Sequence, residues 1–171
     1  MTDGDEVRPA ALSGPTAANG SEQSTTEVTA TVIVNAPAER VFRALTAWER
    51  QGEWIPFTTV KIASGDGGVG STIEAVTAIG PAVLTDTMRI ESIDWPYQVK
   101  VVHTGKILRG PGVMRCTSMG PGRTQVVWHE WFQLPGGLAG RLASPLLWPG
   151  SKAGLTSALR RFARLVEDGT L

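Results

Sequence analysis

The fold of this chain is decided by residues 97–133, YQVKVVHTGKILRGPGVMRCTSMGPGRTQVVWHEWFQ. Three segments within it are enriched in Val, Ile, Thr or aromatic residues, which is typical of β-strands: 97–108, 112–119 and 123–133. Gly and Pro stand between these segments, at 110–112 and 120–122, and indicate turns. Because parallel neighbours would need long crossover connections, such closely spaced strands predict antiparallel hairpins.

The same strand pattern extends towards the N-terminus. Three further segments are rich in strand-forming residues and bounded by Gly or Pro: 57–63, 71–79 and 82–94. Residues 27–35, EVTATVIVN, predict the first strand because they are dense in β-branched side chains. A short helix with a looser turn after it is predicted between Pro37 and Trp48, since proline is tolerated at a first helical position.

A glycine-rich segment, GDGGVG at 65–70, formally matches the G-x-G-x-x-G motif of dinucleotide-binding sites. Such a site requires a helix directly after the motif, so that the pyrophosphate meets the helix N-terminus. Here the next segment, 71–79, has the pattern of a strand. The motif therefore indicates a hairpin turn, and no cofactor is expected.

The last predicted element is an amphipathic helix. Ser151 suits its N-cap and Gly169 suits its end. Four large apolar residues recur between them at helical spacing: Leu155, Leu159, Phe162 and Val166. Segment 138–148, just before, is apolar but contains a proline, which predicts a kinked or split helix. One antiparallel sheet curling around one long helix is an α+β architecture, and its concave apolar surface is a natural ligand cavity.

Composition predicts a single domain, 27–169, behind a flexible tail, 1–26, which is rich in Gly, Ser, Thr, Ala and Pro. The 16 basic residues balance the 16 acidic ones and form no basic stripe, so nucleic acid is not an expected partner. No apolar run approaches the length of a membrane span, and the polar N-terminus is unlike a signal peptide. We therefore expect a cytoplasmic monomer or homodimer without a transmembrane segment.

Several motifs, in their order along the chain, resemble the START-like (SRPBCC) superfamily, in particular bacterial proteins of the polyketide cyclase/dehydrase type. The motifs that carry this resemblance are VIVNAPAERVF at 32–42, WIP at 54–56, GRTQVVW at 122–128, LPGGLAG at 134–140, LRRF at 159–162 and VE at 166–167. The likeness covers roughly residues 28–168. It implies a helix-grip fold, with a curved antiparallel sheet of about seven strands wrapped around a long C-terminal helix and a hydrophobic cavity between them. It does not imply one activity.

Two polar residues, His103 and Glu130, are the candidate catalytic residues. Period-2 alternation places His103 on one face with Val99 and Val101, and Glu130 on one face with Trp128. Aligned with the resemblance, both faces point into the cavity. There the two side chains could orient a ligand or move a proton. The alternative is that each is hydrogen-bonded for structural reasons or lies in water at the cavity mouth.

Metal binding is not expected. The chain has 2 histidines, predicted on opposite strand faces, and a single cysteine, so no cluster of convergent ligands and no internal disulfide can form. Cys116 alternates with Met114 and is interpreted as a small apolar lining residue rather than a nucleophile. No glycine-flanked serine nucleophile of the G-x-S-x-G type occurs.

The preferred function is therefore binding of a small hydrophobic or aromatic molecule, such as a lipid, isoprenoid or polyketide. Thr85, His103 and Glu130 would orient its polar end, and relatives place a residue at the cavity entrance where Trp54 stands here. The remaining predicted lining is apolar: Val99, Val101, Met114, Cys116, Val126, Trp128, Leu155, Leu159 and Phe162.

Two other functions stay open. A polyketide aromatase/cyclase would fold a poly-β-ketone in the cavity and use His103 or Glu130 for proton transfer. An interaction or regulatory protein would have its cavity filled, with the indole of Trp128 deciding much of the free space. Trp131 and Trp148, with basic residues nearby, also suggest a dimer contact or a transient contact with a membrane surface.

Overall fold

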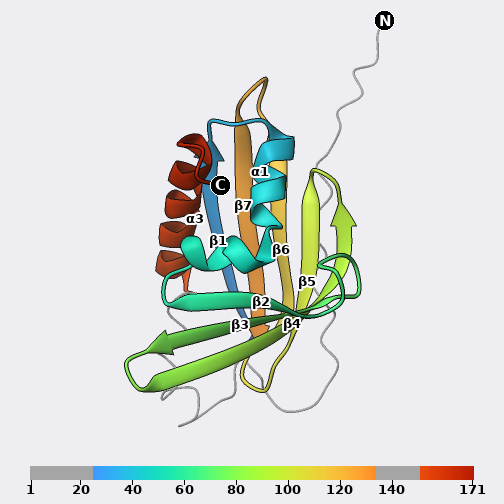
Figure 1. Ribbon diagram of the computed structural model, residues 1–171, viewed down its shortest axis with the longest axis vertical. Helices are drawn as coiled ribbons and strands as arrows, with labels where there is room; N and C mark the ends of the chain where they lie inside the picture. The colour runs from blue at the N-terminus through green and yellow to red at the C-terminus, as the bar shows by residue number, and fades with distance from the viewer. Residues whose placement is uncertain (1–24, 134–150) are drawn as a thin grey trace, which may run out of the picture.

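The computed structural model describes residues 25–133 and 151–171. These residues form a seven-stranded antiparallel sheet in the order β1-β7-β6-β5-β4-β3-β2 (Figure 1). The strands are β1 (Thr25–Val34), β2 (Thr58–Ser64), β3 (Thr72–Ile79), β4 (Ala82–Asp94), β5 (Gln98–Thr104), β6 (Arg109–Ser118) and β7 (Thr124–Gln133). From β2 to β7, each strand pairs with the next in sequence, as the hairpin spacing predicts. The first strand closes the order by pairing with β7.

Two short helical elements follow β1. The helix α1 (Ala38–Leu45) begins directly after Pro37, whose carbonyl accepts from the Val41 amide. It ends where the Thr46 hydroxyl donates to the Phe42 carbonyl oxygen at 2.9 Å, and the 3₁₀ segment η1 (Trp48–Glu53) follows. The single predicted helix between Pro37 and Trp48 is thus shorter, because the Thr46 side chain competes for a terminal carbonyl.

The C-terminal helix α3 (Lys152–Glu167) matches its prediction closely. The Ser151 side chain accepts a hydrogen bond from the Gly154 amide at 3.1 Å, which satisfies one of the unpaired donors of the first turn. Gly169, with a φ of 85°, follows the last turn in the left-handed conformation that glycine adopts without steric cost. In the described part of the chain, α3 packs against β1, α1 against β6 and η1 against β2 (Figure 1).

The predicted α+β helix-grip fold is therefore confirmed, with two further corrections of boundaries. The first strand begins at Thr25, two residues inside the predicted tail; the rest of that tail and the predicted helix at 138–148 lie outside the described residues. The second correction concerns residues 110–112, which were predicted as a turn but lie inside β6. The β5–β6 turn comes earlier, because Thr104 already pairs with Arg109.

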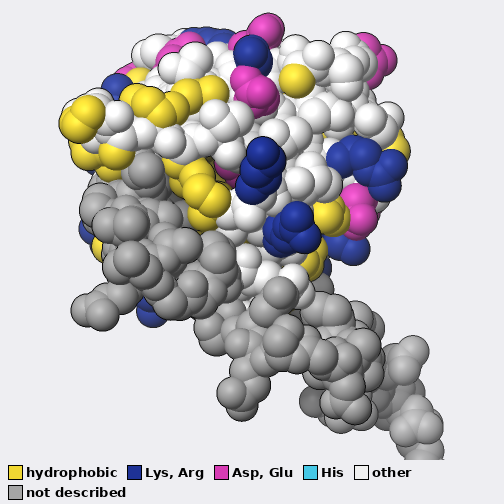
Figure 2. All heavy atoms as spheres, turned by 90° about the horizontal axis from the view of Figure 1, so that it is seen from below, with side chains coloured by type: hydrophobic (Ala, Val, Ile, Leu, Met, Phe, Trp, Pro, Cys, Tyr) yellow, Lys and Arg dark blue, Asp and Glu magenta, His cyan; other side chains and the backbone are white. Residues whose placement is uncertain are grey.

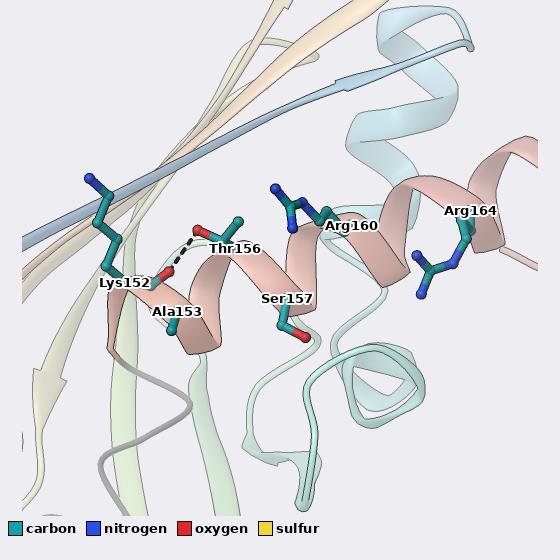
Figure 3. A pocket seen from close by; sticks show the side chains of 6 residues that line it. All are labelled: Lys152, Ala153, Thr156, Ser157, Arg160 and Arg164. Carbon is teal, nitrogen blue, oxygen red and sulfur yellow. Dashed lines mark hydrogen bonds between the residues drawn. The ribbon is translucent and has the colours of Figure 1, made fainter.

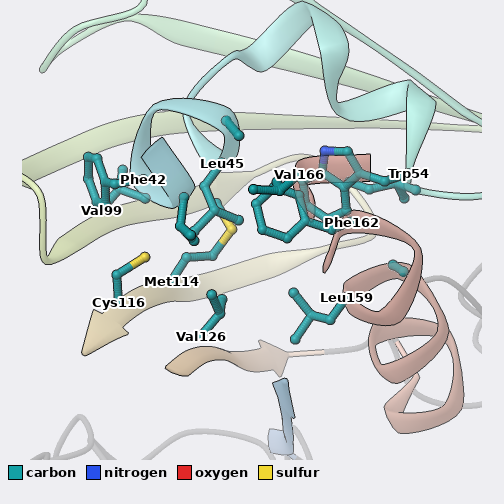
Figure 4. Packing of buried hydrophobic residues seen from close by; sticks show 14 of the residues in the cluster. Phe42, Leu45, Trp54, Val99, Met114, Cys116, Val126, Leu159, Phe162 and Val166 are labelled. Carbon is teal, nitrogen blue, oxygen red and sulfur yellow. The ribbon is translucent and has the colours of Figure 1, made fainter. Parts of the chain in front are cut away.

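A hydrophobic core lies between the sheet and the helices. Its largest fully buried side chains come from α1, α3 and the residues after η1 as well as from the strands: Trp54, Phe42, Phe162, Leu45, Ile73, Ile90, Leu155 and Leu159. Burying one such side chain stabilises the folded state by about 1.5–3 kcal/mol, so this cluster dominates the stability of the fold. Figure 4 shows Phe162 and Trp54 beside one another, and their ring centroids are 5.1 Å apart.

The outside of the molecule is mixed in character. Seen from below, hydrophobic side chains gather at the left, where the β3–β4 hairpin lies, while Lys and Arg side chains on this face stand apart with Asp and Glu between them (Figure 2). Phe57 and Val83 are about 60% exposed, at 61% and 60%. No helix in the described residues is long and apolar enough to cross a membrane.

Candidate functional site

The centre of the candidate site is His103, near the end of β5. Its side chain is 6% exposed, and it follows Val99 and Val101 on the buried face of the strand. Both ring nitrogens have a carboxylate partner. His103 Nδ1 lies 2.7 Å from Asp86 Oδ2 on β4, and Nε2 lies 3.0 Å from Glu130 Oε2 on β7. These three residues are called the charged cluster below.

The indole of Trp128 extends the charged cluster into the apolar core. Its Nε1 donates a hydrogen bond to Glu130 Oε1, so both oxygens of that carboxylate are engaged. The ring of Trp128 packs edge-to-face on Trp54 at 5.6 Å. On the other side, Phe132 packs edge-to-face on the imidazole of His103 at 5.4 Å. The charged cluster is therefore held between aromatic rings rather than in water.

A glycine on β6 leaves the space in which the side chains of His103 and Glu130 meet. The two residues stand on β5 and β7, with β6 between them, and strands two places apart are separated by about 10 Å. The β6 residue paired with Glu130 is Gly112, which has no side chain to fill this space. A Cβ on Gly112 would lie within 2.8 Å of Glu130 Cδ, closer than any relaxed contact. The imidazole and the carboxylate thus meet above β6 where Gly112 has no side chain.

The protonation state of His103 follows from this geometry. Burial by itself acts to lower its pKa, since it disfavours the charged imidazolium. The negative charge of Glu130 and hydrogen bonds to Asp86 and Glu130 outweigh burial and raise the pKa to about 10. At neutral pH the ring is therefore an imidazolium, and each ring N–H donates to one carboxylate. A ring in this state cannot act as a general base.

Two buried polar atoms near the charged cluster lack a hydrogen-bond partner among the described residues. They are the acceptor Asp86 Oδ1 and the donor Trp54 Nε1. Asp86 is 8% exposed and Trp54 is fully buried. Because more than nine in ten buried polar groups in proteins are paired, each of these atoms is a candidate partner for a water molecule or a ligand atom.

The predicted lining residues occupy the interior, with one error. All nine apolar positions lie in the core, and Trp128 is the least buried of them: Val99, Val101, Met114, Cys116, Val126, Trp128, Leu155, Leu159 and Phe162. Thr85 is exposed, so its predicted position inside is wrong. Its neighbour Asp86 takes the inward position, because the buried face of β4 runs through Leu84 and Ile90 with period 2.

Trp54 and Cys116 behave as core residues. Trp54 is fully buried against Trp128 and Phe162, which differs from the expected place at a cavity entrance. Burial raises the pKa of the Cys116 thiol to about 12, so the thiolate needed for nucleophilic attack does not form at neutral pH. No His, Cys, Asp and Glu side chains in residues 25–133 and 151–171 are grouped so as to hold a metal ion.

A separate hollow of about 550 Å³ lies on the solvent side of α3 and is shown in Figure 3. Among the described residues, its lining comes from that helix: Lys152, Ala153, Thr156, Ser157, Arg160 and Arg164. The Thr156 hydroxyl donates to the Lys152 carbonyl oxygen at 2.6 Å. The hollow contains none of the charged cluster and none of the apolar lining.

Comparison with known proteins places this fold in a family. The family model described as polyketide cyclase / dehydrase and lipid transport matches residues 25–167. The chain belongs to that family. Membership implies that it binds a hydrophobic ligand. A search among curated proteins gave no match.

Solved structures share the family's fold at low sequence identity. A protein from Thermus thermophilus is 18% identical with a TM-score of 0.70, covering 85% of this chain and 100% of its own. An aromatase/cyclase from Streptomyces sp. R1128 is 20% identical with a TM-score of 0.72, covering 86% and 97%. Norcoclaurine synthase from Thalictrum flavum, solved in complex with dopamine and hydroxybenzaldehyde, is 14% identical with a TM-score of 0.64, covering 92% and 98%. Identities this low establish the shared fold alone.

Proposed function

We propose that this family member holds one small hydrophobic or aromatic molecule between the sheet and α3. Its apolar part lies against residues such as Met114, Val126 and Trp128, and its polar end meets the charged cluster. The observation that carries this proposal is the charged cluster itself: three buried ionisable side chains, one with an oxygen that has no partner in the described part of the chain.

The stability of the fold does not explain why three ionisable side chains are buried together. Removing charges from water is expensive, and replacing a buried ionic triad by apolar residues of similar volume is often neutral or stabilising. A core selected for stability alone would therefore have Leu or Met at 86, 103 and 130. Ionisable groups that combine burial with specific charge partners are instead typical of functional sites, and a pocket with few convergent polar groups is typical of ligand sites.

Ligand retention gives the direct test. The protein is purified from its own host, and native mass spectrometry looks for a bound molecule that is released on denaturation. Met114→Trp places an indole in the proposed site, whereas Thr117→Trp adds the same side chain at an exposed position of the same strand. We expect the wild type and Thr117→Trp to retain the molecule and Met114→Trp to lose it, with circular dichroism showing that all three are folded.

Absence of a retained molecule would contradict the proposed binding function. If no protein form retains a molecule, and none binds added hydrophobic probes, then Trp54 and Trp128 fill the interior. The chain would then be an interaction or regulatory protein. The same outcome would leave the fold and the family unchanged.

A polyketide aromatase/cyclase is the second candidate, supported by the proton that His103 carries. If one of its hydrogen bonds to a carboxylate breaks, the imidazolium could donate that proton to a ketone oxygen of a bound poly-β-ketone. Binding is the better supported function, because both ring N–H groups are already engaged at 2.7 and 3.0 Å. Incubation with a poly-β-ketone, followed by mass spectrometry of the products, separates the two: an enzyme yields a dehydrated cyclic product, and a carrier returns its ligand unchanged.

A further inference from the structure

We propose that the interior selects its ligand by charge and by hydrogen-bond donation: it takes a polar end that is a neutral hydroxyl or an ammonium group, and it rejects a carboxylate or phosphate. This inference rests on the proposed function and narrows its ligand class. The group responsible is Asp86, which the sequence pattern did not single out.

The charge balance of the interior gives the first reason. Among the buried side chains in the described residues, the formally charged ones are Asp86, His103 and Glu130, and no Lys or Arg is buried there. One imidazolium between two carboxylates leaves a formal charge of −1. An anionic ligand would add a second negative charge in a region from which water is excluded, where charges are poorly screened. An ammonium group would neutralise the excess, and a hydroxyl would add no charge.

The unused hydrogen-bonding capacity gives the second reason. Both ring nitrogens of His103 and both oxygens of Glu130 have partners, so the atom left over in the charged cluster is Asp86 Oδ1. An ionised carboxylate oxygen only accepts hydrogen bonds. The missing partner must therefore donate one, which an O–H or N–H group does and a carboxylate, ketone or ether does not.

The position of Asp86 Oδ1 suits an added ligand atom or a water molecule. A Cβ built on Gly105, at the start of the β5–β6 turn, would lie 3.5 Å from this oxygen and 3.3 Å from the Leu108 carbonyl oxygen, so Asp86 Oδ1 faces the β5–β6 turn. With glycine at 105, no side chain from that position covers it. The unpaired donor Trp54 Nε1 adds no discrimination, because hydroxyl, carbonyl and carboxylate oxygens all accept hydrogen bonds.

The test uses matched ligands that differ only in the polar group. One series is 1-dodecanol, dodecylamine and dodecanoate; the other is 2-naphthol, 2-naphthylmethylamine and 2-naphthoate. Dissociation constants are measured by isothermal titration calorimetry at pH 7, with the alkyl ligands below their micellar concentrations. We expect the alcohol and the amine to bind at least about tenfold more tightly than the acid in the series whose shape fits, since a buried donor–acceptor mismatch is worth this much or more.

Two variants of β4 test whether Asp86 is the origin of the preference. Asp86→Asn keeps the shape of the side chain and removes its charge, so the difference between acid and alcohol should shrink to less than about threefold. Thr85→Asp places a carboxylate on the exposed face of the same strand and should leave the preference unchanged. If Asp86→Asn does not fold, Glu130→Gln removes the same charge from the charged cluster and should weaken rejection of the acid.

The outcomes separate this inference from the function on which it rests. Binding of the acid as tightly as the alcohol, or recovery of an anionic molecule from the native protein, overturns the charge selection and leaves ligand binding intact. A preference that survives Asp86→Asn overturns the role of Asp86. Absence of binding in both series, together with no retained molecule, overturns the inference and the proposed function together.

Discussion

Two regions of the interior follow opposite rules. Where α3 and α1 meet the sheet, the side chains are large, apolar and inaccessible to water, as at Phe42, Leu159 and Phe162. On the buried face of β4, β5 and β7, the side chains include three ionisable groups. The first region lowers the free energy of the folded state by hydrophobic burial, and the second raises it by desolvating charge. The apolar region therefore holds the fold together, whereas the role proposed for the charged cluster is to bind the polar end of a ligand.

The largest expected loss of stability comes from a substitution in the apolar region. Phe162 on α3 is fully buried and packs on Trp54, so Phe162→Ala removes contacts and leaves a cavity. We expect the free energy of unfolding to fall by about 3–5 kcal/mol, measured by urea denaturation followed by circular dichroism. Arg161→Ala, at the exposed position next to it, is the control and should change stability by less than about 0.5 kcal/mol. Equal losses in the two variants would mean that α3 does not pack as described.

The next effect distinguishes breaking the charged cluster from replacing it. His103→Leu leaves two carboxylates facing one another without their cation, and we expect a loss of about 3 kcal/mol or more. The triple variant Asp86→Leu, His103→Met, Glu130→Leu removes all the charge together. We expect its stability to equal or exceed that of the wild type while binding of hydroxylated ligands is lost, as measured by urea denaturation and calorimetry. A triple variant as unstable as the single one would show that the charged cluster is structural.

Most of the fold could be predicted from the sequence, because the patterns that indicate strands, turns and helices are local. Period-2 alternation, Gly and Pro turns and the apolar stripe of α3 each act over a few residues. The same alternation could have identified Asp86, since Leu84 and Ile90 fix the buried face of β4 at even positions. The prediction that Thr85 points inward is off by one position, and an error of one residue reverses the direction of a side chain.

The charged cluster could not be derived in the same way, because it depends on strands that are distant in sequence. Gly110-Pro111-Gly112 has the composition of a turn, and only the pairing of β6 with both neighbours shows that Gly112 lies between β5 and Glu130. The depth of Trp54 likewise follows from its packing on Phe162, which comes from the other end of the chain. Local patterns predict which face a residue occupies; they do not predict which residues meet there.

A smaller effect should follow from filling the gap above β6. Gly112→Ala introduces a methyl group where the Glu130 carboxylate stands, so this carboxylate must move away from His103. We expect a loss of about 1–3 kcal/mol, as for other cases of overpacking, and a lower pKa of His103, measured by NMR titration of the imidazole. Thr117→Ala, on an exposed part of the same strand, should change neither quantity. An unchanged pKa of His103 in Gly112→Ala would contradict the role given to this glycine.

The most gradual effect is a pH dependence of stability that belongs to the charged cluster alone. The pKa of His103 is raised from 6.5 to about 10 in the folded protein, so the folded state holds a proton that the unfolded state releases above pH 6.5. The stabilisation is complete below about pH 6.5 and is lost as pH rises through about 10, with a slope of up to about 1.4 kcal/mol per pH unit between these limits. Cys116, whose pKa is raised from 9.0 to about 12, adds a slope of the same sign only above pH 9.

Urea denaturation between pH 6.5 and 8.5 therefore measures the contribution of His103. His103→Gln should abolish the slope. His129→Gln, which changes the other of the chain's 2 histidines, should retain it. A flat profile in the wild type would mean that the buried ring is neutral, and the interior would then carry a formal charge of −2 beside any ligand.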